Sequence, residues 1–129
     1  MIDFYTAATS NGQRVAIALE EMALAYTAHK LSLPNGDQKK PEFLAINPAG
    51  MIPAIVDQEG PGGKPFSLAQ SGAIVMYLAE KTGKLLPTDA ARRAVARRWL
   101  MQACADCAGA SSAICLSNGM VPDKSPANV

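Results

Sequence analysis

The feature that most constrains the fold is the Ile52-Pro53 step, which leads into an apolar run that ends at Asp57. Proline has no backbone N–H, so it is confined to the edge or to the first residue of a strand. An extended peptide laid along such an edge can pair with the backbone of Ile52, in the manner of an added strand. The run therefore predicts a strand whose beginning faces a ligand rather than another strand.

A polar pair, Gln70-Ser71, stands at the predicted start of a helix farther along the chain. The backbone amides and the hydroxyl group at a helix start favour a carboxylate. The first segment thus predicts a site for a peptide backbone, and the second predicts a site for a carboxylate. Together they indicate a pocket for a small anionic peptide.

The order and spacing of these motifs resemble those of the cytosolic glutathione transferases, over residues 1 to about 87. The resemblance implies an amino-terminal thioredoxin-like domain that binds glutathione, followed by an all-helical domain. Within the family, the chain is most similar to the bacterial nu-class enzymes and their fungal disulfide-reducing relatives. The matching segments are Asn47-Pro48-x-Gly50-x-Ile52-Pro53, Gln70-Ser71-x-Ala73-Ile74, Tyr77-Leu78-Ala79-Glu80-Lys81 and, for the class, Thr9-Ser10-Asn11-Gly12, Gln38 and Pro41-Glu42-Phe43-Leu44.

The hydrophobic pattern predicts an α/β fold for residues 1 to about 83, with the order βαβ-ββα and a right-handed crossover in its first half. The resemblance implies that this domain is thioredoxin-like. Gly83 is placed as the cap at the carboxyl end of the last helix. The expected strands cover residues 2–6, 26–31, 52–57 and 65–68, and the expected helices cover residues 12–23 and 71–82, with one helical turn at 41–46.

After Pro87 the character of the sequence changes. Thr88 or Asp89 can cap a long helix that runs to about residue 116, with Val95 and Trp99 on one stripe, and residues 117–129 are expected to form a loop or a frayed end. The predicted domains are therefore a glutathione-binding domain at 1–83, and a linker with the first helix of an all-helical domain at 84–129. Since the second domain of the resembled family is a bundle of several helices, we expect a fragment or a truncated form, with a functional short form as the alternative.

Charge is distributed unevenly along the chain. Residues 1–80 carry five Lys or Arg and eight Asp or Glu, a balance of −3, whereas residues 81–129 carry seven and three, a balance of +4. Most of the basic residues are arginines of one predicted helix, and no aromatic side chains are interleaved with them on which bases could stack. We therefore expect no nucleic-acid partner. We also expect no signal peptide and no membrane partner, because Met1 leads directly into a strand and no apolar run approaches the roughly 20 residues that span a bilayer.

All three cysteines follow residue 103, and an odd number does not make a disulfide framework, so we expect the reducing cytoplasm. The Cys104-x-x-Cys107 motif invites a redox or zinc interpretation. It lies inside a predicted helix, however, and the single histidine, His29, is distant in the sequence. We therefore expect two small packing residues and no metal site.

The turn after the first strand is where thiol–disulfide proteins of this fold place a reactive cysteine, because a helix amino terminus lowers the pKa of a thiol. This chain has Thr9, Ser10 and Asn11 there and no cysteine before Cys104, so the sulfur must come from the ligand. By resemblance to the nu class, Thr9 and Asn11 are expected to stabilise the thiolate of glutathione, with Ser10 as a third candidate. The simpler interpretation is a helix-capping turn.

The resemblance also implies the remaining contacts with glutathione. Pro53 is expected in the cis form, which would turn the backbone of Ile52 toward the cysteinyl part of the ligand. Gln70 and Ser71 are expected at the γ-glutamyl end, although Gln70 replaces a glutamate found in many nu-class members and loses one charge–charge interaction. Gln38 is expected at the glycyl end, or else it is a solvated loop residue.

These residues indicate a glutathione-dependent enzyme whose bound thiolate attacks an electrophile, a disulfide or a peroxide. The nu-class resemblance favours disulfide or peroxide reduction over conjugation. The second substrate stays open, because the helical domain contributes most of its pocket in this family. The alternatives are a non-catalytic glutathione-binding or interaction module and a thioredoxin-type oxidoreductase that uses Cys104 and Cys107. The resemblance also implies a homodimer.

Overall fold

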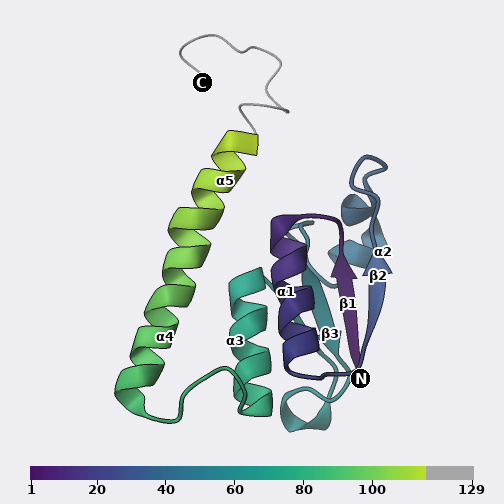
Figure 1. Cartoon of the computed structure of the whole chain (residues 1–129). Coiled ribbons are helices and arrows are strands. Elements are labelled where there is room, and N and C mark those ends of the chain that lie inside the picture. The colour runs from purple at the N-terminus through teal and green to yellow at the C-terminus, as the bar shows by residue number, and fades with distance from the viewer. Residues whose placement is uncertain (116–129) are drawn as a thin grey trace. The chain divides into compact units, whose positions relative to one another are not determined.

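The computed structural model describes residues 1–115, and the loop expected at residues 117–129 lies outside them. The chain divides into two compact units, Met1–Leu86 and Pro87–Val129. The first unit contains a β-sheet with its covering helices, and the described part of the second unit is helical (Figure 1).

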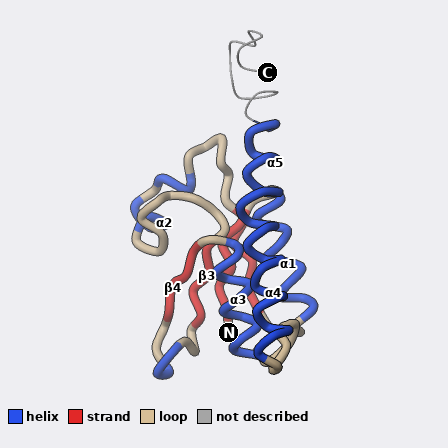
Figure 2. The backbone as a smooth tube through the Cα atoms, turned by 90° about the vertical axis from the view of Figure 1, so that its left-hand side faces the viewer, coloured by secondary structure: helices blue, strands red, loops and turns tan. Residues whose placement is uncertain are grey.

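A four-stranded mixed sheet forms the centre of the first unit, as Figure 2 shows. Strands β1 (Ile2–Thr6) and β2 (Tyr26–Lys30) are parallel, and helix α1 (Ser10–Glu21) connects them. Strand β3 (Ala54–Asp57) is antiparallel to β1 and to its other neighbour β4 (Phe66–Ala69), so the strand order is β2-β1-β3-β4. The predicted mixed α/β fold is confirmed.

Alternation along the strands divides their side chains between the two faces of the sheet. On one face, apolar side chains of β1 and β3 are buried in a core with α1 and α3 (Ser71–Thr82). On the opposite face, the ring of Tyr5 lies 6.0 Å from the ring of Phe43 in α2 (Pro41–Leu44). The core consists of Ile2, Phe4, Val15, Ala18, Leu19, Met22, Ile55, Ile74, Leu78 and Ala79.

Helix α1 and strand β3 each begin two residues from the predicted start. Helix α1 begins at Ser10 instead of Gly12, because the side chain of Thr9 accepts a hydrogen bond from the backbone N–H of Gly12 and caps the helix earlier. Strand β3 begins at Ala54 instead of Ile52, since the proline between them has no N–H to donate to a ladder.

The described part of the second unit is a run of helix with a change of geometry in its middle. It consists of α4 (Ala90–Gln102), a π-helical segment η3 (Ala103–Cys107) and α5 (Ala108–Cys115). The carboxylate of Asp89 accepts a hydrogen bond from the N–H of Arg92 at 2.8 Å and caps α4. The single long helix of the prediction is therefore interrupted by a π-helical turn. Within residues 1–115, no helix combines the length and the apolar character that a bilayer crossing requires.

A buried carboxylate, Asp57, joins the end of β3 to α3. It accepts hydrogen bonds from the hydroxyl of Tyr77 at 2.6 Å, from the ammonium of Lys81 at 2.5 Å and from the backbone N–H of Glu59 at 3.0 Å. Burial alone would raise the pKa of Asp57, but these hydrogen bonds outweigh burial and hold its pKa below the usual value. Burial and the bond to Asp57 raise the pKa of Tyr77 to about 12. Asp57 is therefore a permanently charged anchor for α3 at neutral pH.

Replacing Lys81 by Met is expected to lower the free energy of unfolding by about 3–5 kcal/mol, because it leaves a buried carboxylate without its cation. Lys40→Met is the matched control. Lys40 lies 2.7 Å from Asp37, but these side chains are 60% and 26% exposed, whereas Asp57 is 1% exposed. An exposed pair contributes little to stability, because water and salt screen the attraction between its charges. Urea denaturation at pH 7 measures both losses, and equal losses would contradict the role given to burial.

The difference in the free energy of unfolding between the native chain and Lys81→Met is also expected to depend on pH. The folded pKa of Asp57 is lowered, so its stabilisation is complete above an unfolded pKa of about 3.9 and is lost as pH falls through the folded pKa. In Lys81→Met, only the bonds from Tyr77 and Glu59 oppose the effect of burial, so the folded pKa is expected to rise and protonation to stabilise the variant. The two free energies of unfolding should therefore approach each other as pH is lowered from 7 to 4. A constant gap over this range would be the contrary result.

Candidate functional site

Thr9 and Gly12 shape the start of α1. The backbone of Thr9 is extended, and its Oγ1 accepts the N–H of Gly12 at 3.1 Å. A Cβ atom at Gly12 would lie 2.4 Å from Oγ1 of Thr6 and 2.6 Å from the carbonyl oxygen of Ala7, so glycine allows a close approach of the chain at this turn. Because the oxygen of the Thr9 hydroxyl accepts the helix bond, its O–H can still donate to a ligand.

A small hollow of about 110 Å³, the peptide hollow, lies beside the start of α1. It brings together predicted site residues from three segments: α1, the turn before β3 and the start of α3. The Ile52–Pro53 peptide bond in its wall is cis, as predicted. The lining residues are Asn11, Asn47, Met51, Ile52, Pro53, Gln70 and Ser71.

Arg14 of α1 holds the start of α3. Its Nη1 donates a hydrogen bond to the Oγ of Ser71 at 2.7 Å, and Ser71 is buried. The Ser71 hydroxyl and the first N–H groups of α3 can then donate toward the peptide hollow. Gln70 precedes the helix with φ 72° and ψ 112°, and its side chain does not cap α3. Gln70 and Ser71, the residues predicted to bind a carboxylate, therefore stand at the start of α3, and the side chain of Gln70 does not cap the helix.

Asn47 holds the turn that leads to Ile52, a role that the sequence analysis did not assign. Its Nδ2 donates to the carbonyl oxygen of Met51 at 2.7 Å, and its Oδ1 accepts the N–H of Ala49 at 3.2 Å. The side chain is buried, so these bonds fix the position of the backbone before β3. The Asn47-Pro48 dipeptide carried the signal, because asparagine side chains close turns through neighbouring backbone groups.

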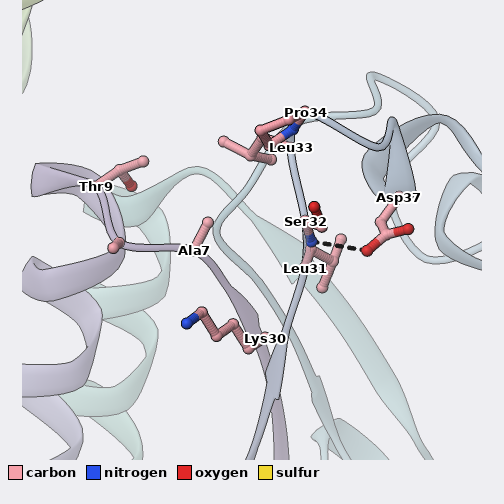
Figure 3. A pocket seen from close by; sticks show the side chains of 9 residues that line it. Ala7, Thr9, Lys30, Leu31, Ser32, Leu33, Pro34 and Asp37 are labelled. Carbon is pink, nitrogen blue, oxygen red and sulfur yellow. Dashed lines mark hydrogen bonds between the residues drawn. The ribbon is translucent and has the colours of Figure 1, made fainter.

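A larger hollow of about 520 Å³, the strand-end hollow, lies where β1 and β2 end (Figure 3). Thr9 is its one lining residue that the sequence predicted as a site residue. The signal for the others is topological, because ligands of open α/β sheets bind outside the carboxyl ends of the strands. The lining residues are Ala7, Ala8, Thr9, Lys30, Leu31, Ser32, Leu33, Pro34 and Asp37.

Two predicted site residues, Ser10 and Gln38, line neither hollow. Ser10 is the first residue of α1 and is exposed. Gln38 lies in a short 3-10 segment, η1 (Asp37–Lys39), and its Oε1 is buried without a hydrogen-bond partner. Buried polar atoms are almost always hydrogen-bonded, so this oxygen is a candidate acceptor for a ligand donor.

The cysteine motif and the histidine have other surroundings. Cys104 is half-buried and Cys107 is exposed on the π-helical segment η3, so the expectation of two packing residues is wrong for Cys107. The Nε2 atom of His29 lies 2.9 Å from Oδ1 of Asp3, and its ring stacks on Tyr5 at 4.6 Å, which gives it a structural role on the sheet. Within the described part of the chain, no three His, Cys, Asp or Glu side chains are grouped to hold a metal ion.

Comparison with known sequences identifies relatives of this chain. The family model of the glutathione S-transferase N-terminal domain matches residues 9–81. Disulfide-bond oxidoreductase YfcG of Escherichia coli (strain K12) is 50% identical over 101 residues, which cover 78% of this chain and 47% of the relative. Disulfide-bond oxidoreductase YghU of the same strain is 37% identical over 105 residues, which cover 77% of this chain and 36% of the relative. The chain thus spans about half or less of the length of these relatives.

Solved structures are similar over more than nine-tenths of the chain. A glutathione transferase from Pseudomonas putida, with one glutathione disulfide bound per subunit, matches with a TM-score of 0.91 and 41% identity over 97% of this chain and 54% of that chain. A glutathione transferase family member from Pseudomonas fluorescens pf-5, with two glutathione bound, matches with a TM-score of 0.88 and 42% identity. The match covers 92% of this chain and 52% of that chain. The thioredoxin-like fold of the first unit is therefore confirmed.

Thr9→Val is expected to lower the free energy of unfolding by about 1 kcal/mol, because it removes the hydroxyl cap of α1 while preserving the shape of the side chain. Thr9→Ser keeps the hydroxyl and serves as the matched variant, with a loss of less than half that value. Urea denaturation without any ligand measures both. If Thr9→Val were as stable as the native chain, the cap would contribute nothing to the fold.

Proposed function

Since the chain belongs to the glutathione S-transferase family, we propose that it binds glutathione and stabilises its thiolate for attack on a disulfide. The observation that carries the proposal is that Thr9 and Asn11 stand at the start of α1, between the two hollows, where no cysteine is present. The names of YfcG and YghU as disulfide-bond oxidoreductases support a disulfide as the acceptor.

The start of α1 supplies the groups that stabilise the thiolate. The hydroxyl of Thr9 and the side-chain amide of Asn11 act as donors, and Ser10 is the third candidate. No acidic residue lies in the first turn of α1, so its positive end is not neutralised within the turn. Lowering a thiol pKa of about 8.5 by about two units corresponds to roughly 2.7 kcal/mol, which two charge-assisted hydrogen bonds can supply.

The peptide hollow supplies the contacts that hold glutathione. The backbone of Ile52, next to Pro53, pairs with the cysteinyl residue in the manner of an added strand. Ser71 and the first N–H groups of α3 bind the γ-glutamyl carboxylate, and Gln70 accepts from the γ-glutamyl amino group. Gln38 accepts a hydrogen bond from the backbone N–H of the glycyl residue through its unpaired Oε1.

The proposed reaction is a thiol–disulfide exchange. The thiolate attacks one sulfur of the acceptor, its S–S bond breaks, and a mixed disulfide forms between glutathione and that half. The other half leaves as a thiolate and takes up a proton from solvent. A second glutathione resolves the mixed disulfide, so two glutathione molecules are oxidised to glutathione disulfide for each acceptor reduced.

We propose residues 1–83 as the glutathione-binding domain, and residues 84–129 as a linker with the first helix of an all-helical domain. The proposed assembly is a homodimer. Val95 and Trp99 of α4 are 53% and 56% exposed, and apolar surface of this kind supports association. The cytoplasm is the proposed location, because thiols and glutathione are kept reduced there.

Titrating the ultraviolet absorbance of the thiolate of bound glutathione tests the proposal. The pKa of the bound thiol is expected about two units below 8.5, and Thr9→Val and Asn11→Ala are each expected to raise it by about one unit. Thr9→Ser, which keeps the donor, should leave the pKa low. Binding with an unshifted pKa would indicate a non-catalytic glutathione-binding module, and a failure to bind would refute the proposed site.

A further inference from the structure

The strand-end hollow has one cationic side chain, Lys30, among its lining residues. In the parallel pairing of β1 and β2, Lys30 lies opposite Thr6, on the face of the sheet that α1 covers, because the preceding pair of Tyr5 and His29 belongs to the opposite face. Figure 3 shows the Lys30 side chain extending from β2 toward the chain that enters α1. The strand alternation thus directs an ammonium group toward the region next to Thr9.

The single carboxylate that lines the same hollow, Asp37, is already engaged. It accepts the N–H of Ser32 at 2.7 Å and lies 2.7 Å from the ammonium of Lys40. The hydrogen bond of Lys40, followed by that of Ser32, lowers the pKa of Asp37. Lys30, in contrast, forms no ion pair within residues 1–115. The hollow therefore has one uncompensated positive charge, which suits an anionic ligand.

The two hollows lie on either side of the start of α1, since Thr9 lines one and Asn11 lines the other. A thiolate held between these residues would have its own peptide in the peptide hollow and the strand-end hollow in front of its sulfur. The remaining walls of the strand-end hollow are mostly apolar, from Leu31, Leu33 and Pro34. Such a space accommodates a short apolar chain that ends in a carboxylate.

We propose that the strand-end hollow is the acceptor site and that Lys30 makes it selective for small disulfides that carry a carboxylate. This inference rests on the proposed function, because it assigns the second substrate of the same thiolate. Lys30 binds the carboxylate of the acceptor, and it takes no part in the exchange of sulfur bonds. It is a specificity-determining residue that acts on the binding of the acceptor.

Two disulfides of similar length separate charge from size: 3,3′-dithiodipropionate, a dianion at neutral pH, and the uncharged bis(2-hydroxyethyl) disulfide. The readout is the ratio of their kcat/KM values for glutathione-dependent reduction by the full chain. Lys30→Met is expected to lower this ratio about tenfold, mainly through the KM of the dianion. Lys30→Arg should keep the ratio, and so should Lys64→Met, which removes an exposed lysine in the loop before β4. An unchanged ratio in Lys30→Met, or an equal fall in Lys30→Arg, would overturn the proposal.

Calorimetric binding of the same two disulfides to the full chain, without glutathione, keeps the inference testable if no turnover occurs. The native chain should bind the dianion more tightly than the diol, and Lys30→Met should lower the ratio of the two affinities about tenfold. Selective binding without glutathione turnover would refute the proposed function and retain the acceptor site. Turnover with no charge preference would refute the acceptor site and retain the proposed function. Equal binding of both disulfides by the native chain would overturn the proposal.

Discussion

The buried carboxylate of Asp57 is the interaction on which the geometry of the first unit depends. It fixes the last turns of α3 through Tyr77 and Lys81, and a helix anchored at one end has a defined position at its other end. That other end is the start of α3, where Arg14 of α1 binds Ser71. The two helix starts that form the candidate site are therefore held by an anchor that lies at the opposite end of α3.

Features that depend on a few neighbouring residues could be predicted from the sequence. The cis form of Pro53 followed from a family motif, and Gly83 ends α3 in the left-handed conformation expected of a cap glycine. Asp89 caps α4 as one of the two predicted alternatives. The positions of Asn11 and Gln70 at one hollow followed from motifs whose spacing is specific to the family, rather than from any property of either residue alone.

Features that depend on distant segments could not be predicted in this way. Lys30 is an ordinary charged residue at the end of a strand, and its proposed role arises because the parallel pairing of β2 with β1 places it opposite Thr6, in the hollow that Thr9 also lines. The hollow that they share is a property of the sheet topology.

Local rules also compete with one another. The cap by Thr9 competed with the apolar spacing that had placed the start of α1 at Gly12, and the cap decided the boundary.

Gln70 shows that the site departs from the sequence that would make the fold most stable. The backbone of Gln70, at φ 72° and ψ 112°, lies in a region that residues with a side chain rarely adopt, at a cost on the order of 1–3 kcal/mol. Glycine would relieve that strain, but it would leave the peptide hollow without an amide side chain at this position. Selection for stability alone would therefore tend to remove Gln70. A glycine found here in a related chain would indicate that its fold had been kept while its ligand was lost.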